Sequence, residues 1–369
     1  MRRHAVRITL AILMSLGLCQ STVGSSRAED GAPGGGPHDH SSHHAGHDMG
    51  PGALLTFSPA FGDMVYHLHP AGTWMANLRF MHMDMNGLRD GTTDVPVEKV
   101  IPMMGSQYGF MMAPTGMTMD MYMLMVMYGV TERLTISAMG SYQYNKMDML
   151  MNMGMGMGNV AQPPMRTEGV GDTEVAASYG IARNLVGTLA VSIPTGSIDH
   201  KTTMMGMEFR APYDMQTGSG TFDLKPSLTY NALSGDSAWN WGAQGTYVWR
   251  MGKNGNDYSL GNVFKATGWL QRAFGPAASW LRLAYGDTGR IKGSDPEIDK
   301  ILDPVMGAPT PDAVPGNYGG QRLDAFLGMS FGYGPVSLGV EGGVPLYQNL
   351  NGLQLKTDWL LTVGVQAMF

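Results

Sequence analysis

Apolar and polar residues alternate along most of the chain beyond residue 72. The clearest stretch runs from Met117 to Tyr128, where every second residue is methionine and the residues between are Thr, Asp, Tyr, Leu, Val and Tyr. Successive side chains of a β-strand leave on opposite faces, so a period of two predicts a strand with one face of thioethers. The stretch is long enough to cross a bilayer, because a tilted strand needs about 9–11 residues.

The same alternation recurs in about twelve segments, which we interpret as strands. They lie near residues 73–85, 117–128, 134–145, 172–181, 185–193, 222–230, 239–250, 260–270, 281–285, 322–333, 336–341 and 356–369. Long connections are expected near 86–116, 146–168, 195–220 and 287–320, and short ones near 129–133, 182–184, 231–237, 273–278 and 334–335. Short turns at one end and long loops at the other are typical of outer-membrane barrels.

These patterns predict an all-β fold, a transmembrane antiparallel up-and-down β-barrel of about 12 strands. The sheet must close, because unpaired strand edges cannot face lipid. No stretch after the N-terminus is apolar over 18 residues, so no transmembrane helix is expected. The apolar face carries aromatic residues near strand ends, as in aromatic girdles: Trp74, Tyr142, Tyr144, Trp239, Trp249 and Trp359.

The opposite face of the strands is polar and charged, which fits a hydrated lumen. The charged residues expected there are Arg79, Asp172, Glu174, Asp223, Lys225, Arg250, Arg282, Arg322, Asp324 and Glu341. Two interpretations stay open for this set. The side chains bind a solute, or they pair with one another and fill a narrow barrel.

The N-terminus resembles a secretory signal. Three arginines within the first seven residues precede a short apolar run, Ile8 to Cys19, and Ser26-Arg27-Ala28 offers a small-x-small cleavage pattern. We therefore divide the chain into a signal peptide (1–28), a disordered leader (29–62) and the barrel (63–369). Cys19 also permits a lipoprotein interpretation, although Leu18 is large where such signals have a small residue. The mature chain without Cys19 has no cysteine.

The last residue is aromatic. Phe369 ends an alternating strand, and such an ending resembles the signal that bacterial barrel-assembly machinery recognises. Together with the export signal, it predicts an outer-membrane location, with membrane lipid as one partner. The chain is 15% charged with a net charge of −6. No basic patch is present, so a nucleic-acid partner is not expected.

The leader is rich in Gly, Pro and His and cannot bury a core. Five histidines crowd into ten residues, His38, His40, His43, His44 and His47. His-rich tracts bind metals such as Cu, Zn and Ni. The alternative is a flexible tail with incidental histidines.

Methionine is the most unusual feature of the composition, with 34 residues. A thioether is a soft ligand that favours Cu(I) or Ag(I), so copper is the candidate ion. The candidate ligands in the strands are Met81, Met83, Met85, Met117, Met119, Met121, Met123, Met125 and Met127. Two alternatives remain. Methionine lines the lumen as an adaptable apolar group, or it scavenges oxidants.

Three runs resemble a group of Met-rich bacterial outer-membrane transporters. They are W-M-A-N-L-R-F-M-H-M-D-M-N-G-L-R-D-G-T from Trp74, M-M-A-P-T-G-M-T-M-D-M-Y-M from Met111 and E-G-V-G-D-T from Glu168. The group is similar to the family of outer-membrane components of the phenol meta-cleavage pathway. The resemblance implies an outer-membrane barrel linked to aromatic solutes or to metal handling. The His/Met-rich leader also resembles that of the copper-resistance outer-membrane protein B family.

The leading hypothesis is a channel or transporter with a Met-lined lumen that handles soft metal ions. One alternative is an uptake barrel for hydrophobic or aromatic solutes, and another is a non-transporting envelope protein that binds metal. An enzyme is not expected, because no Gly-x-Ser-x-Gly motif or other catalytic set can be identified.

Overall fold

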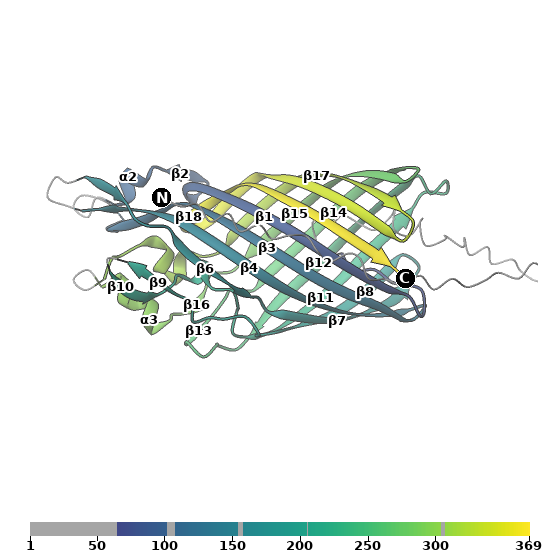
Figure 1. Ribbon diagram of the computed structural model, residues 1–369, viewed down its shortest axis with the longest axis horizontal. Helices are drawn as coiled ribbons and strands as arrows, with labels where there is room; N and C mark the ends of the chain where they lie inside the picture. Colours follow the sequence, from purple (N-terminus) through teal and green to yellow (C-terminus); the bar gives the residue numbers. More distant parts are fainter. Residues whose placement is uncertain (1–64, 102–107, 154–157, 205, 304–306) are drawn as a thin grey trace, which may run out of the picture. The chain divides into compact units, whose positions relative to one another are not determined.

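The computed structural model describes residues 65–101, 108–153, 158–204, 206–303 and 307–369, which form an antiparallel β-barrel (Figure 1). Its wall is built, in sheet order, from β18 (Val336–Met368), β17 (Gly320–Tyr333), β15 (Ala277–Thr288), β14 (Val263–Phe274), β12 (Trp239–Met251), β11 (Phe222–Leu233), β8 (Leu185–Ile193), β7 (Thr173–Ala182), β4 (Leu134–Asn152), β3 (Met112–Thr131) and β1 (Trp74–Gly91). β18 pairs back with β1, from Met75 opposite Met368 to Gly91 opposite Leu350. The barrel is therefore closed, as expected.

The long element β18 supplies two neighbouring spans of the wall. Its first half pairs with β17 and its second half with β1. The two halves also meet each other, because the side chain of Gln348 hydrogen-bonds the backbone of Thr357 in both directions. At the other end, the amide of Met368 donates to the carbonyl of Pro335, the residue before β18, at 2.9 Å. The wall thus reaches the twelve spans expected from the sequence, although it contains eleven strand elements.

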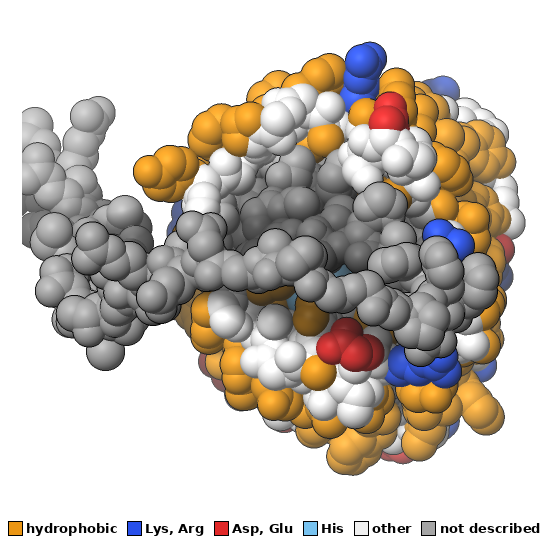
Figure 2. Space-filling view, turned by 90° about the vertical axis from the view of Figure 1, so that its right-hand side faces the viewer, with side chains coloured by type: hydrophobic (Ala, Val, Ile, Leu, Met, Phe, Trp, Pro, Cys, Tyr) orange, Lys and Arg blue, Asp and Glu red, His pale blue; other side chains and the backbone are white. Residues whose placement is uncertain are grey.

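Five short turns of the described chain lie at one end of the barrel. They join β3 to β4, β7 to β8, β11 to β12, β14 to β15 and β17 to β18, as the loop lengths predict. The outer wall at this end is largely covered by hydrophobic side chains (Figure 2). β6 (Met165–Val170) pairs with β4 from Tyr142 to Met147, beyond the part of β4 that pairs with β7. The other small elements belong to the long connections at the other end: β2 (Thr93–Val95), α2 (Val97–Val100), β5 (Asn159–Ala161), β9 (Lys201–Met204), β10 (Met207–Arg210), η1 (Tyr213–Met215), β13 (Tyr258–Ser259), β16 (Lys292–Gly293), α3 (Pro296–Asp299), η2 (Lys300–Leu302), η3 (Pro311–Ala313) and η4 (Pro315–Asn317).

Side chains alternate between the two faces of the wall as the sequence predicts. On β3, Tyr122 and Leu124 are more than half exposed, whereas Met125 and Met127 are buried at 5% and 1%. Trp74, Tyr142, Trp249 and Trp359 are also exposed on the outer face. Among the described residues, no helix is long and apolar enough to cross a membrane.

The strands run further toward the long loops than expected. β4 continues to Asn152, so Met147, Met149 and Met151 lie in a strand rather than in a loop. One expected strand starts later than predicted. β14 begins at Val263. Just before it, Gly261 passes so close to the backbone of Gly289 that a Cβ there would lie 1.8 Å from the carbonyl oxygen.

Aromatic rings lie across glycines of neighbouring strands inside the wall. A Cβ on Gly328 would meet the ring of Trp280 at 2.2 Å, and one on Gly343 would meet the ring of Phe326 at the same distance. Packing of aromatic rings over strand glycines helps to fix the register of a sheet. This arrangement accounts for part of the high glycine content.

Candidate functional site in the barrel interior

A set of methionines on β1, β3 and β4 lies on the face of the sheet opposite the exposed aromatic residues, and we call it the methionine stripe. It comprises Met75, Met81, Met83, Met85, Met117, Met119, Met121, Met123, Met125, Met127, Met139 and Met147. Near the short turns, Met75, Met125 and Met127 are buried together against Met139. At the opposite end, Met117 and Met147 belong to a larger apolar core. The middle of the stripe is half-buried and borders open space, as do Met139 and Met85 beside it.

The middle of the stripe consists of methionines that stand opposite one another. Met81 pairs in register with Met121, and Met83 pairs with Met119. Directly opposite residues of an antiparallel pair have Cβ atoms about 4.5–5.5 Å apart. Met121 lines a cavity of about 400 Å³, and Met83 lines two further cavities of about 310 and 270 Å³. Thioethers therefore form part of the wall of each of these three cavities.

The acidic residues and the histidine between these methionines in the sequence point outward instead. His82, Asp84 and Asp120 occupy the alternate positions of β1 and β3, and His82 Nδ1 lies 2.6 Å from Asp120 Oδ1. The ring of His82 also stacks against Trp359, at 4.8 Å between centroids. These groups are separated from the thioethers by the sheet itself. Among the described residues, no group of three or more His, Cys, Asp or Glu could hold a metal ion.

Most of the charged residues expected in the lumen are paired with one another in the structure. Lys225 Nζ lies 2.7 Å from Glu174 Oε2, and Arg250 pairs with Asp223. Arg322 Nε lies 2.8 Å from Asp324 Oδ2. Arg282 pairs with Glu341, as described below. Arg79 and Asp172 have other polar partners: Arg79 donates to Asn77 Oδ1 at 2.8 Å, and Asp172 accepts from Gly196 N and from Ser219. The interpretation that these charges pair with one another thus describes much of the set.

The most deeply buried pair joins β15 to β18. The guanidinium of Arg282 binds the carboxylate of Glu341, and these residues are 2% and 1% exposed. Trp280 Nε1 donates to Glu341 Oε2 at 2.6 Å, and the guanidinium carbon of Arg282 lies 3.8 Å from the ring centroid of Phe326. These contacts stabilise the wall and leave this pair little freedom to bind a solute.

The segment that precedes β1 lies inside the barrel. The hydroxyl of Tyr66 donates to Glu174 Oε1 at 2.6 Å, and the amide of Tyr66 donates to Gln244 Oε1 at 2.9 Å. The amide of His69 donates to Thr135 Oγ1 at 2.9 Å. We call residues Val65 to Pro70 the luminal segment. It narrows the interior near the short turns, and sequence reasoning placed it only as the start of the barrel domain.

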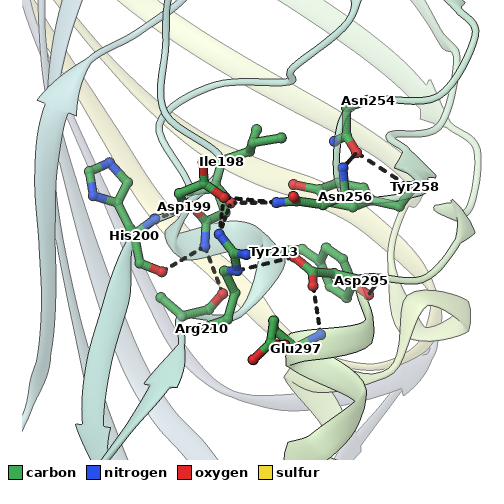
Figure 3. Close-up of polar contacts among 12 residues, drawn as sticks. Ile198, Asp199, His200, Arg210, Tyr213, Asn254, Asn256, Tyr258, Asp295 and Glu297 are labelled. Carbon is green, nitrogen blue, oxygen red and sulfur yellow. Dashed lines mark hydrogen bonds and ion pairs between the residues drawn. The ribbon is translucent and has the colours of Figure 1, made fainter.

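Three long connections fold over the other end of the barrel and contact one another. We call the described parts of residues 194–221, 252–262 and 289–319 the cap (Figure 3). Arg210 forms ion pairs with Asp199 and, at 3.3 Å, with Asp295. Asn256 Nδ2 donates to Asp199 Oδ1 at 3.1 Å, and the amide of Asp295 donates to the hydroxyl of Tyr213 at 3.0 Å. These contacts link all three connections.

The cap shares its apolar core with the methionines at that end of the stripe. The buried members include Met112, Met117, Met147, Met149, Met151, Met165, Met215, Tyr213, Tyr258, Ile298 and Ile301. Methionine is unbranched and fills irregular gaps well. Here the thioethers pack against aliphatic and aromatic groups, which is a structural role that the alternation alone could not distinguish from ligation.

Two buried carboxyl groups meet beneath the cap. Burial, and secondarily the charge of Asp312, raise the pKa of Asp214 to about 8. Burial also raises the pKa of Asp312 to about 6. In the described part of the chain, Asp214 Oδ1 and Asp312 Oδ2 have no hydrogen-bond partner. At neutral pH the pair is therefore most stable when it holds a proton.

Lys265 is a lumen residue that sequence analysis missed. It lies on β14 opposite Gly286 and lines all three cavities that the methionines border. Its side chain is exposed, and within the described ranges it has no ion pair or hydrogen bond. The signal was weak because the segment near 260–270 alternates poorly. The inward positions of Lys265 and Thr267 become clear only from the register.

The comparisons with known proteins concern the fold. No protein-family model matches the sequence, and no curated protein matches it. Among solved structures, the chain is similar to the COG4313 outer membrane channel from Pseudomonas putida F1, with 14% identity and a TM-score of 0.54 over 84% of this chain and 100% of that one. The similarity to a TodX monoaromatic hydrocarbon channel mutant extends over 86% of this chain and 92% of that one, with 10% identity and a TM-score of 0.43. The similarity to a Pseudomonas aeruginosa FadL homologue extends over 80% of this chain and 89% of that one, with 10% identity and a TM-score of 0.37.

The first of these similarities shows that the chain has the fold of an outer-membrane channel. The metal-ligand prediction for the methionines stays a prediction. The signal peptide (1–28), the leader (29–62) and its histidines His38, His40, His43, His44 and His47 lie outside the described residues, and the predictions made for them also stand as predictions.

Proposed function

We propose that this protein is an outer-membrane channel for small solutes, exported through a cleaved signal peptide. The closed wall and its apolar, aromatic outer face support insertion in a bilayer, since a barrel without edges satisfies its backbone internally. The short turns would face the periplasm and the cap the exterior. Phe369, which is 72% exposed at the short-turn end, would be read by the barrel-assembly machinery.

The solutes that suit this interior are small organic molecules with an apolar part. The observation that carries this proposal is the middle of the methionine stripe, where Met81, Met83 and Met121 border cavities whose other walls carry polar and charged groups. Ligand pockets are typically about 300–1,000 Å³ and mostly apolar with a few polar groups. Cavities of about 310 and 400 Å³ reach this range. The flexible thioethers would adapt to different apolar shapes.

A soft metal ion is the second candidate solute. Met81 stands opposite Met121 and Met83 opposite Met119, so neighbouring thioethers could bind Cu(I) or Ag(I) in succession. Because His82 and Asp120 are on the outer face, thioethers would supply the soft ligands here. A non-transporting barrel that binds metal through the leader histidines is the third candidate.

One triple variant separates the organic from the metal proposal. Met81→Leu, Met83→Leu and Met121→Leu together keep the apolar volume but remove the sulfur. In planar bilayers, we expect the wild-type protein to carry a KCl current that phenyl-bearing ions block more strongly than their methyl analogues. The triple variant should still be blocked more strongly by the phenyl-bearing ions than by their methyl analogues.

The control is Met251→Leu with Met329→Leu, since both side chains are exposed on the outer face. No current in any condition would contradict the channel proposal, and equal block by phenyl and methyl ions would contradict the apolar passage. Saturable Ag(I) binding that the triple variant loses and the control keeps would establish the metal candidate instead.

A further inference from the structure

Lys265 differs from the other cations on the inner face of the described strands. Lys225, Arg250, Arg282 and Arg322 each have a carboxylate partner. Arg79 donates to an amide oxygen. Lys265 has neither an ion pair nor a hydrogen bond among the described residues, and it is exposed to the cavities. A lone ammonium group in a narrow lumen is available to an incoming anion.

The cavity of about 310 Å³ has a positively charged lining. It is lined by Lys265 and Arg322 and contains no Asp or Glu among its lining residues. Arg322 forms an ion pair with Asp324, but its side chain remains one-third exposed. Its Nη1 also donates to Thr357 Oγ1 at 2.8 Å, which holds the guanidinium in place on the cavity wall.

An apolar surface lies beside these cations. Met83 and Met85 line the same cavity, and the sulfur of Met83 is 4.0 Å from Arg322 Nη1. Gln348 adds a neutral polar group. A ligand that fits would place a single negative charge between Lys265 and Arg322 and a small apolar body against the thioethers.

We propose that this cavity, formed by Lys265, Arg322, Met83 and Met85, is a binding site for small organic anions with an apolar body, such as aromatic or short aliphatic carboxylates and sulfonates. The site rests on the proposed channel function and specifies its solute class. Lys265 determines the preference for the anion, and the methionines hold the apolar part.

The test uses benzenesulfonate and phenyltrimethylammonium, two permanently charged ions of similar size. The full chain is placed in planar bilayers, and the concentration of each ion that halves the KCl current is measured. We expect benzenesulfonate to block at a lower concentration than the cation. Lys265→Gln should raise the benzenesulfonate concentration about twofold to fivefold, because an exposed ion pair is worth up to about 1 kcal/mol and 1.4 kcal/mol is tenfold. Lys265→Arg should retain the block.

The matched control is Arg272→Gln on the same strand. Arg272 is exposed on the outer face, where its guanidinium carbon lies 5.1 Å from the ring centroid of Trp239, so this change should leave the block unaltered. A wild-type current blocked equally by both ions, or a Lys265→Gln variant with unchanged block, overturns the anion site while the channel stands. The absence of any wild-type current overturns the channel function itself.

Discussion

The hydroxyl of Tyr66 donates a 2.6 Å hydrogen bond to Oε1 of Glu174, a residue of β7 that lies 108 positions away in the sequence. Glu174 Oε2 is engaged at 2.7 Å by Lys225. One carboxylate on the wall therefore binds both the segment that precedes the first strand and a cation of β11. This contact holds the luminal segment in the interior.

Removing that contact should widen the passage. Hydrogen bonds to charged groups contribute about 1.5–3 kcal/mol, so Tyr66→Phe is expected to loosen the luminal segment without unfolding the wall. We expect a larger or more frequently open single-channel conductance in planar bilayers. Tyr230→Phe is the control, because that ring is exposed on the outer face. An unchanged conductance for Tyr66→Phe would show that this bond does not restrain the segment.

The buried pair of Arg282 and Glu341 should be essential for stability. Glu341→Ala leaves an uncompensated guanidinium that is 2% exposed, and breaking one side of a buried pair costs about 3–5 kcal/mol. We expect a loss of this size in the free energy of unfolding, measured by urea titration in lipid vesicles. The double change Arg282→Met with Glu341→Leu should recover much of the loss, because it removes both charges.

The contact between Gly328 and Trp280 provides a test of packing within the wall. A methyl group on Gly328 would lie 2.2 Å from the indole ring, and overpacking of this kind costs about 1–3 kcal/mol. Gly328→Ala should therefore lower the free energy of unfolding by that amount. A methyl group on Gly286 would have no atom within 4 Å, so Gly286→Ala should have no comparable cost. Equal effects of the two changes would contradict the role of the ring.

The cap should loosen as the pH rises. The pKa of Asp214 is about 8 and that of Asp312 about 6 in the folded cap, against an ordinary value of 3.8. The folded cap therefore retains protons that the unfolded cap has lost, and its stability falls as the pH rises from about 4 to about 8. Hydrogen exchange of residues 211–216, corrected for the intrinsic rate, should speed up over this range.

The carboxylate variants provide the controls for this pH effect. Asp214→Asn should remove the larger part of the dependence, because the pKa of Asp214 is raised further than that of Asp312. Asp312, whose pKa is raised by burial, should retain the smaller part. Asp236→Asn should leave the dependence unchanged, since that carboxyl is on an exposed short turn. A cap whose exchange does not depend on pH in the wild-type chain would contradict the protonated pair.

Much of the wall could be predicted from the sequence because each strand contains its own signal. The alternation of Met with other residues from Met117 to Tyr128 assigns the side chains to two opposite faces of a strand, and it requires no knowledge of the neighbouring strands. For the charged residues expected in the lumen, the sequence left two interpretations open, solute binding or pairing with one another. The ion pair of Lys225 with Glu174 joins β11 to β7, which are not adjacent strands, so no local pattern could predict it.

The remainder depends on contacts that no local pattern contains. The cap core joins Met147 and Met151 to Tyr213 and Ile301, residues that lie far apart in the sequence and have no shared period. The luminal position of Tyr66 depends on Gln244, 178 residues away. Likewise, the available ammonium of Lys265 can be recognised only when the partners of the other cations on the described strands are known.

The proposed channel function depends most on which way the methionine stripe faces and on whether the interior conducts ions. In a chain with Cys19 replaced by serine, Met121→Cys and Tyr122→Cys place a single thiol on the two faces of β3. The conductance is measured before and after treatment with a charged, water-soluble thiol reagent. We predict that labelling reduces the current through the Met121→Cys barrel and leaves that through the Tyr122→Cys barrel unchanged. The opposite pattern, or no current through either barrel, would contradict the account.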